Sequence, residues 1–411
     1  MSGTETKTSE RTYQQTHPWI TFKLDLTQAP YLLWMDLGAI QSKIEHVANA
    51  LLPPEEAQKL HILYLAKGAH ATTAIEGNTL SEEQVRDRIV RKTSLPESKE
   101  YLGTEIDNIV KTCNAIGEEV WGGKDTRLTV ERIKTFNREV LMGLPLEDET
   151  TPGEFRKYSV GAANYRGAPW QDCEYLIQRL CQWLNDEITP PDSELSMGYA
   201  VIKAVMAHLY IAWIHPFGDG NDRTARLAEF QILLSGRAPS VAAHLLSNFY
   251  NQTRTEYYRQ LALASQSPAG AMRFLLYAMR GLRDALDEQI QIIRMYQWEV
   301  AWRDYVYQKF HGQKGEAVER RRLLALELPK ADKCRVLPAR LRRLTPEIAE
   351  RYANKTDKTL SRDINELLEM KLIRRVGKEV EVNGEILTQL LPQRSADDSY
   401  NGPQKLDHEI C

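Results

Sequence analysis

The sequence predicts a mostly α-helical protein: a helical bundle with one small β-hairpin, followed by a C-terminal domain of helices and a two-stranded wing. Three observations lead to this fold class. Apolar side chains recur at helical spacing through most of the 411 residues. Residues 151–169 break that spacing with three glycines and two prolines. Residues 313–395 change to a basic composition with short segments separated by turn signals.

The overall composition is that of an ordinary globular protein. The hydrophobic fraction is 42%, the charged fraction is 27% and the formal charge is −3, which argues against a surface that is basic all over. The cysteines lack CxxC spacing and favour reduced thiols without a zinc site or disulfide framework. They are Cys113, Cys173, Cys181, Cys334 and Cys411. With no secretory signal and no apolar run of about 18 residues, we expect a cytoplasmic protein that does not contact a membrane.

Five parts are predicted along the chain. They are a disordered tail over 1–17, an N-terminal helical region over 18–98, a helical core with a long trailing helix over 99–312, a winged-helix domain over 313–395 and a second disordered tail over 396–411. In the first three parts, helices are predicted over 31–51, 55–75, 100–121, 129–141, 172–187, 200–214, 224–235, 253–264 and 270–310. Residues 19–26 alternate and predict an edge strand or an extended segment.

Local signals mark several helix ends. Gly77 follows the helix over 55–75 at the position where a left-handed residue commonly ends a helix. Ser81 is an N-cap, and the glutamates after it suit the first turn of the next helix. Trp298 and Trp302 lie one helical turn apart and predict packing rather than a ligand platform.

The C-terminal segment has the order helix, turn, helix and wing. A basic helix is predicted over 316–328. Thr345 caps the next helix, which begins with proline, and Thr356 begins the one after it. Residues 372–391 alternate like two strands, with Asn383-Gly384 predicted at their turn.

This segment is also locally basic. Residues 330–378 contain 14 Lys and Arg against 7 Asp and Glu, although the whole chain is slightly acidic. Such an asymmetry favours contact with phosphate groups, as in DNA. Asp357 and Asp363 in the second helix count against DNA, so use of the domain for dimerisation or protein docking remains open.

The chain is organised around His215 to Arg226, with the sequence HPFGDGNDRTAR. Helical patterns precede and follow it, and a proline and two glycines interrupt them, which predicts a helix, a tight loop and a second helix. The loop therefore lies at a helix N-terminus, where free N–H groups and the helix dipole favour anions. It holds a base, an acid, an amide and two arginines, the groups needed to attack a phosphorus centre.

This loop resembles the signature of the Fic family, HPFx[D/E]GN[G/K]RxxR. Further stretches extend the resemblance over most of the chain. They are Ala207-His208 before the loop, Gly153-Glu154-Phe155-Arg156 at the entry to a flap hairpin, Thr255-Glu256-Tyr257-Tyr258 after the loop, and Thr72-xxx-Glu76-Gly77. The last of these is similar to the family's inhibitory motif, [S/T]xxxE[G/N].

The resemblance implies a protein adenylyltransferase, which moves AMP from ATP to a Tyr, Thr or Ser hydroxyl of a target protein. His215 would be the general base, and Asp219 would hold Mg²⁺ beside the phosphates. The other implied contacts are with the phosphates of ATP. They come from the amides of Gly220, Asn221 and Asp222 together with the Asn221 side chain, from Arg223 to the β-phosphate and from Arg226 to the γ-phosphate.

The same resemblance places two further groups of residues around the nucleotide. Val160 and Gly161 would lie in the flap, where strand addition would align the backbone of the target. Tyr257 and Tyr258 would line the adenine pocket, with core packing as the alternative interpretation.

Glu76 has an implied regulatory role. It would pair with Arg226 in place of the γ-phosphate and hold ATP in an unproductive position, since one arginine cannot serve both partners. Relatives of this kind can also use such a glutamate to activate water and remove AMP. The sequence does not choose between the two roles.

Asp222 departs from the family pattern, which has glycine or lysine there. We expect a side chain to crowd the phosphate where glycine would not, and a carboxylate about 4 Å from a phosphate costs on the order of 4 kcal/mol at an effective dielectric of about 20. Transfer of a different phosphate-containing group, such as UMP, therefore stays open. So does a DNA-binding regulator whose Fic domain senses a nucleotide or is inactive. The expected partners are an unknown target protein, which could be the chain itself, DNA, or a second copy in a homodimer.

Overall fold

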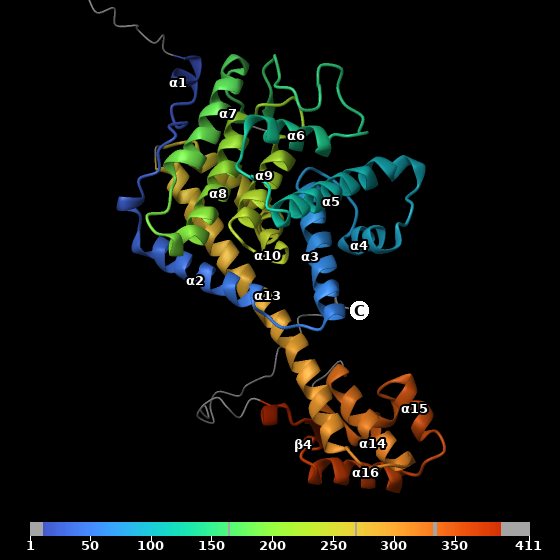
Figure 1. The fold of residues 1–411 in the computed structure, drawn as a ribbon. Coiled ribbons are helices and arrows are strands. Elements are labelled where there is room, and N and C mark those ends of the chain that lie inside the picture. Colours follow the sequence, from blue (N-terminus) through green and yellow to red (C-terminus); the bar gives the residue numbers. More distant parts are fainter. Residues whose placement is uncertain (1–10, 163–164, 268, 332–334, 388–411) are drawn as a thin grey trace, which may run out of the picture. The chain divides into compact units, whose positions relative to one another are not determined.

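The computed structural model describes residues 11–162, 165–267, 269–331 and 335–387 (Figure 1). Contacts divide the chain into two compact units, 1–290 and 291–411. The division lies inside the long helix α13 (Gly270–Lys309) rather than after residue 312. The reason is packing, because Trp302, Val306 and Phe310 belong to the hydrophobic core of the second unit.

The first unit is built from helices, as predicted. They are α1 (Thr12–Thr16), α2 (Tyr31–Ala48), α3 (Pro54–Ala74), α4 (Glu82–Arg91), α5 (Glu100–Trp121), α6 (Val130–Val140), α7 (Cys173–Gln182), α8 (Ser196–Ile214), α9 (Asn221–Ser235), α10 (Ser240–Ala243), α11 (Leu245–Gln252), α12 (Arg254–Ala264) and the first part of α13. A π-helical turn, Trp183–Glu187, continues α7. Ser81 caps α4 and exchanges hydrogen bonds with Gln84, as a capping box does.

Helices α8 and α9 pack against each other and form the buried centre of this unit (Figure 1). From Ala200 to Ile214, every residue of α8 except Lys203 is buried. The segment Ser193–Ile214 is long and apolar enough to cross a membrane, but 83% of its apolar window is buried inside the protein, as in a core helix. The loop between α8 and α9 is therefore held between two rigid elements.

The predicted N-terminal tail is wrong for residues 11–17. Tyr13 is buried, and its backbone N–H donates to the carboxylate of Asp172 at 2.9 Å. The His17 ring lies 2.9 Å from the carbonyl oxygen of Arg166. These tertiary contacts order a segment whose polar sequence gives no such signal. Residues 1–10 and the predicted tail over 396–411 lie outside the described residues.

Two short segments settle open points of the sequence. Residues 20–25 have no regular structure and no strand pairing, and Leu26 begins the 3-10 helix η1 (Leu26–Gln28), so the predicted edge strand is wrong. Phe22 is buried and has a left-handed φ of 51°. The predicted hairpin is present as β1 (Gly161–Ala162) and β2 (Tyr165–Arg166), which pair antiparallel. Its two tip residues, 163 and 164, lie outside the described part.

The second unit has the predicted order of helix, turn, helix and wing, with one strand more. Its elements are α14 (Glu316–Glu327), β3 (Arg335–Val336), the 3-10 helix η7 (Pro338–Arg343), α15 (Pro346–Tyr352), α16 (Asp357–Glu369), β4 (Ile373–Val376), β5 (Glu379–Val382) and the 3-10 helix η8 (Gly384–Leu387). The strand order in its sheet is β3-β5-β4. Trp302 stacks on Trp298, and its indole N–H donates to the carbonyl of Ala325, so the predicted packing role is confirmed.

The predicted turn of the wing is wrong. The chain reverses at Gly377-Lys378, where Gly377 has the positive φ of 60° that a tight hairpin turn requires. The Asn383 side chain instead donates to the carbonyl of Lys371 and helps end the hairpin. The alternation of the sequence continues across the turn and hides it. Residues 388–391, the end of the predicted wing, lie outside the described residues.

Candidate active site

The loop from His215 to Gly220 is defined by left-handed residues at both ends. His215 ends α8 with φ of 51°, while its N–H still donates to Ile211 at 2.9 Å. Gly220 precedes α9 with φ of 74°, and a Cβ there would lie 3.1 Å from the Asn137 side chain. Because glycine has no side chain to cap the helix, the first N–H groups of α9 are left for another acceptor.

Asn221 holds the loop closed. Its Oδ1 accepts from the N–H of Phe217 at 2.8 Å, and its Nδ2 donates to the carbonyl of the same residue at 2.9 Å. The side chain is buried, so the predicted phosphate contact is left to the backbone at this position. Asn137 of α6 supports the loop from outside, donating to the carbonyl of Asp219 at 2.8 Å.

Arg156 joins the loop to the hairpin. It is buried, and its guanidinium donates to the carbonyls of His215 at 2.7 Å, Tyr158 at 2.6 Å and Ala168 at 2.5 Å. This residue belongs to the stretch that resembles the flap entry, although the sequence did not give it a role. It fixes the backbone that carries His215.

The hairpin lies directly beside His215. The N–H of Gly167 donates to the carbonyl of Val160 at 3.1 Å, and a Cβ at Gly167 would come within 2.9 Å of the His215 Cβ. In the described part of the chain, β1 pairs with β2 alone. Gly161 is exposed on this strand, so its second edge can accept another strand.

His215 has the electrostatics of a neutral base. Burial lowers the pKa of its imidazole, while the negative charges of Asp222 and Asp219 oppose that shift. The neutral form therefore predominates near pH 7, and its free ring nitrogen can accept a proton.

Arg223 is held by two carboxylates. Its Nη2 lies 3.1 Å from Oδ1 of Asp219 in the loop, and its Nη1 lies 2.9 Å from Oε1 of Glu105 in α5. The other Glu105 oxygen accepts from the Asn78 side chain at 2.8 Å. Glu105 thus links the loop to the segment after α3. No sequence motif marked it, because its partners come from two distant parts of the chain.

Arg226 contacts the predicted glutamate. Its Nη2 lies 2.6 Å from Oε1 of Glu76 and also donates to the carbonyl of Thr72 at 2.9 Å. The Arg226 side chain is 1% exposed. Among the described residues, its Nε and Nη1 have no hydrogen-bond partner, which is costly for buried donors. The site therefore holds a buried cation with two unpaired guanidinium nitrogens, Nε and Nη1.

Glu76 is presented by the turn that ends α3. Gly77 has φ of 104°, as predicted for the residue that ends this helix. Burial and the charge of Asp222 raise the pKa of the Glu76 carboxyl, and the Arg226 guanidinium opposes both. The carboxylate stays paired but is less stabilised than one with several donors.

Asp222 is a normal first-turn residue of α9. Its backbone is helical rather than left-handed, so its Cβ causes no strain there, and an acidic side chain suits a helix N-terminus. The negative charge of this aspartate acts to raise the pKa of both His215 and Glu76. Its electrostatic cost to a bound phosphate remains.

The two tyrosines of α12 have different surroundings. Tyr257 is fully buried, and its hydroxyl lies 2.9 Å from the His208 ring, so it packs in the core rather than lining an open pocket. Tyr258 is 40% exposed, and its hydroxyl donates to the carbonyl of Ile75 at 3.3 Å. Arg254 donates to the same carbonyl at 2.7 Å. Helix α12 thus supports the segment that carries Glu76.

A buried acid, Glu229, lies behind the site and was not predicted from the sequence. Glu229 lies on α9 three residues after Arg226 and is 1% exposed. It accepts from the Tyr250 hydroxyl at 3.0 Å and lies 3.5 Å from the His208 ring. The only signal was its position in a helix that is buried on every side.

Comparison with known proteins agrees with this geometry. Residues 127–233 match the model of the Fic/DOC family. The chain is 27% identical over 235 residues to protein adenylyltransferase fic-1 of Caenorhabditis briggsae, covering 55% of this chain and 41% of that protein. It is 30% identical over 229 residues to protein adenylyltransferase Fic of Drosophila erecta, covering 54% and 40%. The chain thus spans less than half the length of these relatives.

A solved structure shares the fold of most of the chain. It is a Fic family protein from Desulfovibrio desulfuricans G20, with a TM-score of 0.53 and 21% sequence identity. The match covers 90% of this chain and 99% of that one. The Fic fold is therefore accompanied by related structure outside residues 127–233.

Proposed function

We propose that this chain is a protein adenylyltransferase that transfers AMP from ATP to a Tyr, Thr or Ser hydroxyl of a cytoplasmic target protein. The observation that carries the proposal is the loop itself: a neutral His215 lies beside an uncapped helix N-terminus and two buried arginines. The names of the relatives over the matching region support it. The chain itself is one candidate target.

In this reaction, His215 accepts the proton of the target hydroxyl as its oxygen attacks the α-phosphorus. The new bond joins AMP to the target, the bond to the β-phosphate breaks, and pyrophosphate leaves. The first N–H groups of α9 bind the phosphate oxygens through the backbone. Arg223 and Arg226 stabilise the negative charge of the phosphates that leave.

The residues present fit a bound Mg²⁺. Asp219 has a half-exposed side chain, and in the described chain its hydrogen bonds use Oδ1 alone, which leaves Oδ2 for a metal. The described residues contain no cluster of three or more ligating side chains. Mg²⁺ suits such a site, because it commonly takes one or two carboxylates and completes its shell with phosphates and water. When bound, it would neutralise charge on the phosphates.

Glu76 is proposed as the inhibitory residue. Its carboxylate binds the guanidinium of Arg226 that the γ-phosphate of ATP would need. The unpaired Nε and Nη1 of Arg226 suit a phosphate, which offers more acceptor oxygens than one carboxylate. A second role is compatible with the same position. A carboxyl with a raised pKa is a stronger base, which would favour activation of water for removal of AMP.

Two alternatives make different demands on the site. A nucleotide-sensing or inactive Fic domain in a DNA-binding regulator would need the arginines but no base, so an ordered and neutral His215 favours the enzyme. Transfer of another group, such as UMP, is favoured by Asp222 alone. Binding of DNA by the second unit would be an additional property that leaves the transfer reaction intact.

The proposal is tested with the Glu76→Gly protein, Mg²⁺ and ATP labelled on either the α- or the γ-phosphate. We expect the α-label to become covalently attached to protein and the γ-label to remain in solution. His215→Ala in the same background should abolish labelling. Attachment of the γ-label would instead identify phosphoryl transfer and contradict the proposal. The other three nucleoside triphosphates, labelled on the α-phosphate, serve as competing donors.

A further inference from the structure

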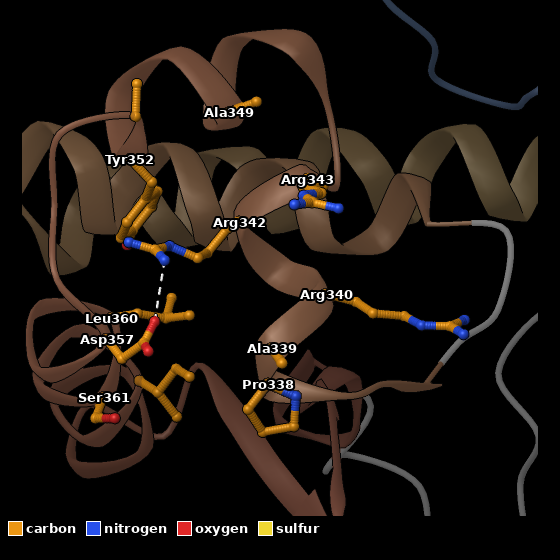
Figure 2. Close-up of a pocket in the computed structure, with 12 residues that line it drawn as sticks. Pro338, Ala339, Arg340, Arg342, Arg343, Ala349, Tyr352, Asp357, Leu360 and Ser361 are labelled. Atoms are coloured by element: carbon orange, nitrogen blue, oxygen red, sulfur yellow. Dashed lines mark hydrogen bonds and ion pairs between the residues drawn. The ribbon is translucent and has the colours of Figure 1, made fainter.

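The second unit has a groove that the transfer reaction does not use (Figure 2). Its volume is about 960 Å³, and it is lined by the 3-10 helix η7, by α15 and by the first turns of α16. Three arginines of η7 stand along one side, Arg340, Arg342 and Arg343. In Figure 2, Arg342 points toward Asp357, whereas Arg340 extends away from the other labelled side chains.

Several exposed cations of the second unit are available for an external partner. Arg340, Arg343, Lys358 and Arg362 are exposed, and none of them makes an ion pair within the described residues. The β4–β5 hairpin adds Lys378 at its turn, also exposed. Most other arginines described in this unit are bound to carboxylates. Arg340 and Arg343 line the groove, whereas Lys358 and Arg362 lie on α16 outside its lining.

The two acids that counted against DNA do not face a partner. Asp363 is 1% exposed and accepts from Arg320 at 2.7 Å, from Arg321 at 2.9 Å and from the Tyr352 hydroxyl at 2.9 Å. It joins α14, α15 and α16 from inside the core. Asp357 is exposed but paired with Arg342 at 3.0 Å. Asp363 is thus structural, and the charge of Asp357 is neutralised by Arg342, whereas Lys358 and Arg362 of the same helix have no ion-pair partner among the described residues.

We propose that the second unit binds duplex DNA, with the exposed face of α16 in the major groove. That face carries Lys358, Ser361, Arg362 and Asn365, which follow the helical spacing i, i+3, i+4 and i+7 and are all exposed. The opposite face, with Leu360, Asp363, Ile364 and Leu367, is buried. Arginine, asparagine and serine are side chains that read base edges, and lysine binds phosphate.

The surrounding elements suit duplex DNA better than an acidic peptide. Helices α15 and α16 are joined by a short turn, and the second helix of such a pair is the one that enters the major groove. Phosphates line both sides of the major groove of DNA, and the exposed arginines Arg340 and Arg343 of η7 and Lys378 of the hairpin are cations that can bind them. A peptide in the groove would leave the amide and hydroxyl of the α16 face unused.

The test measures binding of the full chain to a labelled random-sequence duplex of about 30 base pairs at about 50 mM salt, by fluorescence anisotropy. The test variant is Lys358→Gln with Arg362→Gln. The control is Lys23→Gln with Lys99→Gln, which removes the same charge from exposed positions of the first unit. We expect the test variant to weaken binding at least about tenfold and to lower the salt dependence by about two ions. The control should stay within about twofold of the parent.

Three results would overturn the proposal. The first is no saturable binding at low salt. The second is an equal loss in the test and control variants, which would indicate non-specific attraction. The third is displacement of the DNA by a polyglutamate peptide. If this peptide binds the parent protein as tightly as the DNA does, and binds the test variant more weakly, the partner would be an acidic protein. Unchanged thermal unfolding of both variants would show that the substitutions act on binding rather than on folding.

Discussion

Each unit of this protein contains an arginine–carboxylate pair in its interior, and the two pairs differ in how completely they are satisfied. Asp363 in the second unit is 1% exposed and accepts hydrogen bonds from two arginines and a tyrosine. Glu76 in the first unit has a side chain that is 27% exposed and, among the described residues, accepts a hydrogen bond only from Arg226. Two guanidinium nitrogens of Arg226, Nε and Nη1, are left without a partner in the described chain.

The difference separates a structural pair from a functional one. A buried carboxylate that has all its donors ties elements together, and removing it leaves buried cations without compensation. A buried arginine with unpaired donors has lost its hydrogen bonds to water without replacing all of them by protein partners. A ligand that supplies more acceptors can therefore displace its present partner. Phosphate is such a ligand.

The largest effect is expected from the base. His215→Ala in the Glu76→Gly background should lower the rate of AMP transfer by about 10²- to 10⁴-fold, because the variant lacks the imidazole that takes the hydroxyl proton. Labelling from ATP over time measures it. Glu229→Gln, which alters a buried acid behind the site but not the base, should retain most of the rate. A comparable loss in that variant would contradict the role given to His215.

Loss of the structural pair at Asp363 should lower the stability of the second unit and leave the rate of AMP transfer unchanged. Asp363→Ala should lower the free energy of unfolding of the second unit by about 3–5 kcal/mol, because it leaves the buried Arg320 without its carboxylate. Urea unfolding followed by fluorescence of the stacked Trp298 and Trp302 measures this change. Asp357→Ala is the matched control: its carboxylate is 92% exposed, and we expect a loss of about 0.5 kcal/mol or less. Equal losses would remove the distinction between the pairs.

Substitution of Glu105 in the first unit should have a smaller effect, on the affinity for ATP. It holds Arg223 at 2.9 Å, and its negative charge opposes a phosphate at the same guanidinium. Glu105→Gln should therefore tighten ATP binding by about three- to tenfold, the effect expected from about 1 kcal/mol of charge repulsion. Calorimetric titration of the Glu76→Gly/His215→Ala protein with ATP measures it. Weaker binding in the variant would mean that Glu105 positions Arg223 for the phosphate.

The smallest effect concerns pH. Because burial lowers the pKa of His215, the imidazole stays neutral at pH values below the usual histidine pKa of about 6.5. We therefore expect kcat/KM to fall only as the pH drops through this lowered pKa. The charge of Asp222 raises that pKa, so Asp222→Gly should shift the acidic limb to lower pH. The profile is measured in the Glu76→Gly background. A shift to higher pH would contradict the proximity of the two side chains.

Local signals made much of this fold predictable. Proline, glycine and capping residues punctuate the helices, so the ends of α3 and α4 and the loop between α8 and α9 follow from a few neighbouring residues. The pair of Glu76 and Arg226 was predictable through its motif, although its members lie 150 positions apart. The turn of the wing was not, because alternation continues through Gly377.

Partners of buried polar residues could not be predicted in the same way. Glu105, Glu229 and Asp363 all lie within helices, and nothing in their local sequence says which distant side chain they meet. Tyr257 and Tyr258 are neighbours with the same chemistry, yet one is buried and the other is partly exposed. Such assignments depend on how helices pack, which helical spacing constrains only in part.

The most direct test of the regulatory claim is the intact mass of the parent and Glu76→Gly proteins after equal incubation with Mg²⁺ and ATP. The account predicts that the Glu76→Gly protein gains the mass of AMP, while the parent gains little or none. Equal gain in both proteins would show that Glu76 does not restrain Arg226. No gain in Glu76→Gly, even with Asp222→Gly added, would contradict self-modification by this site.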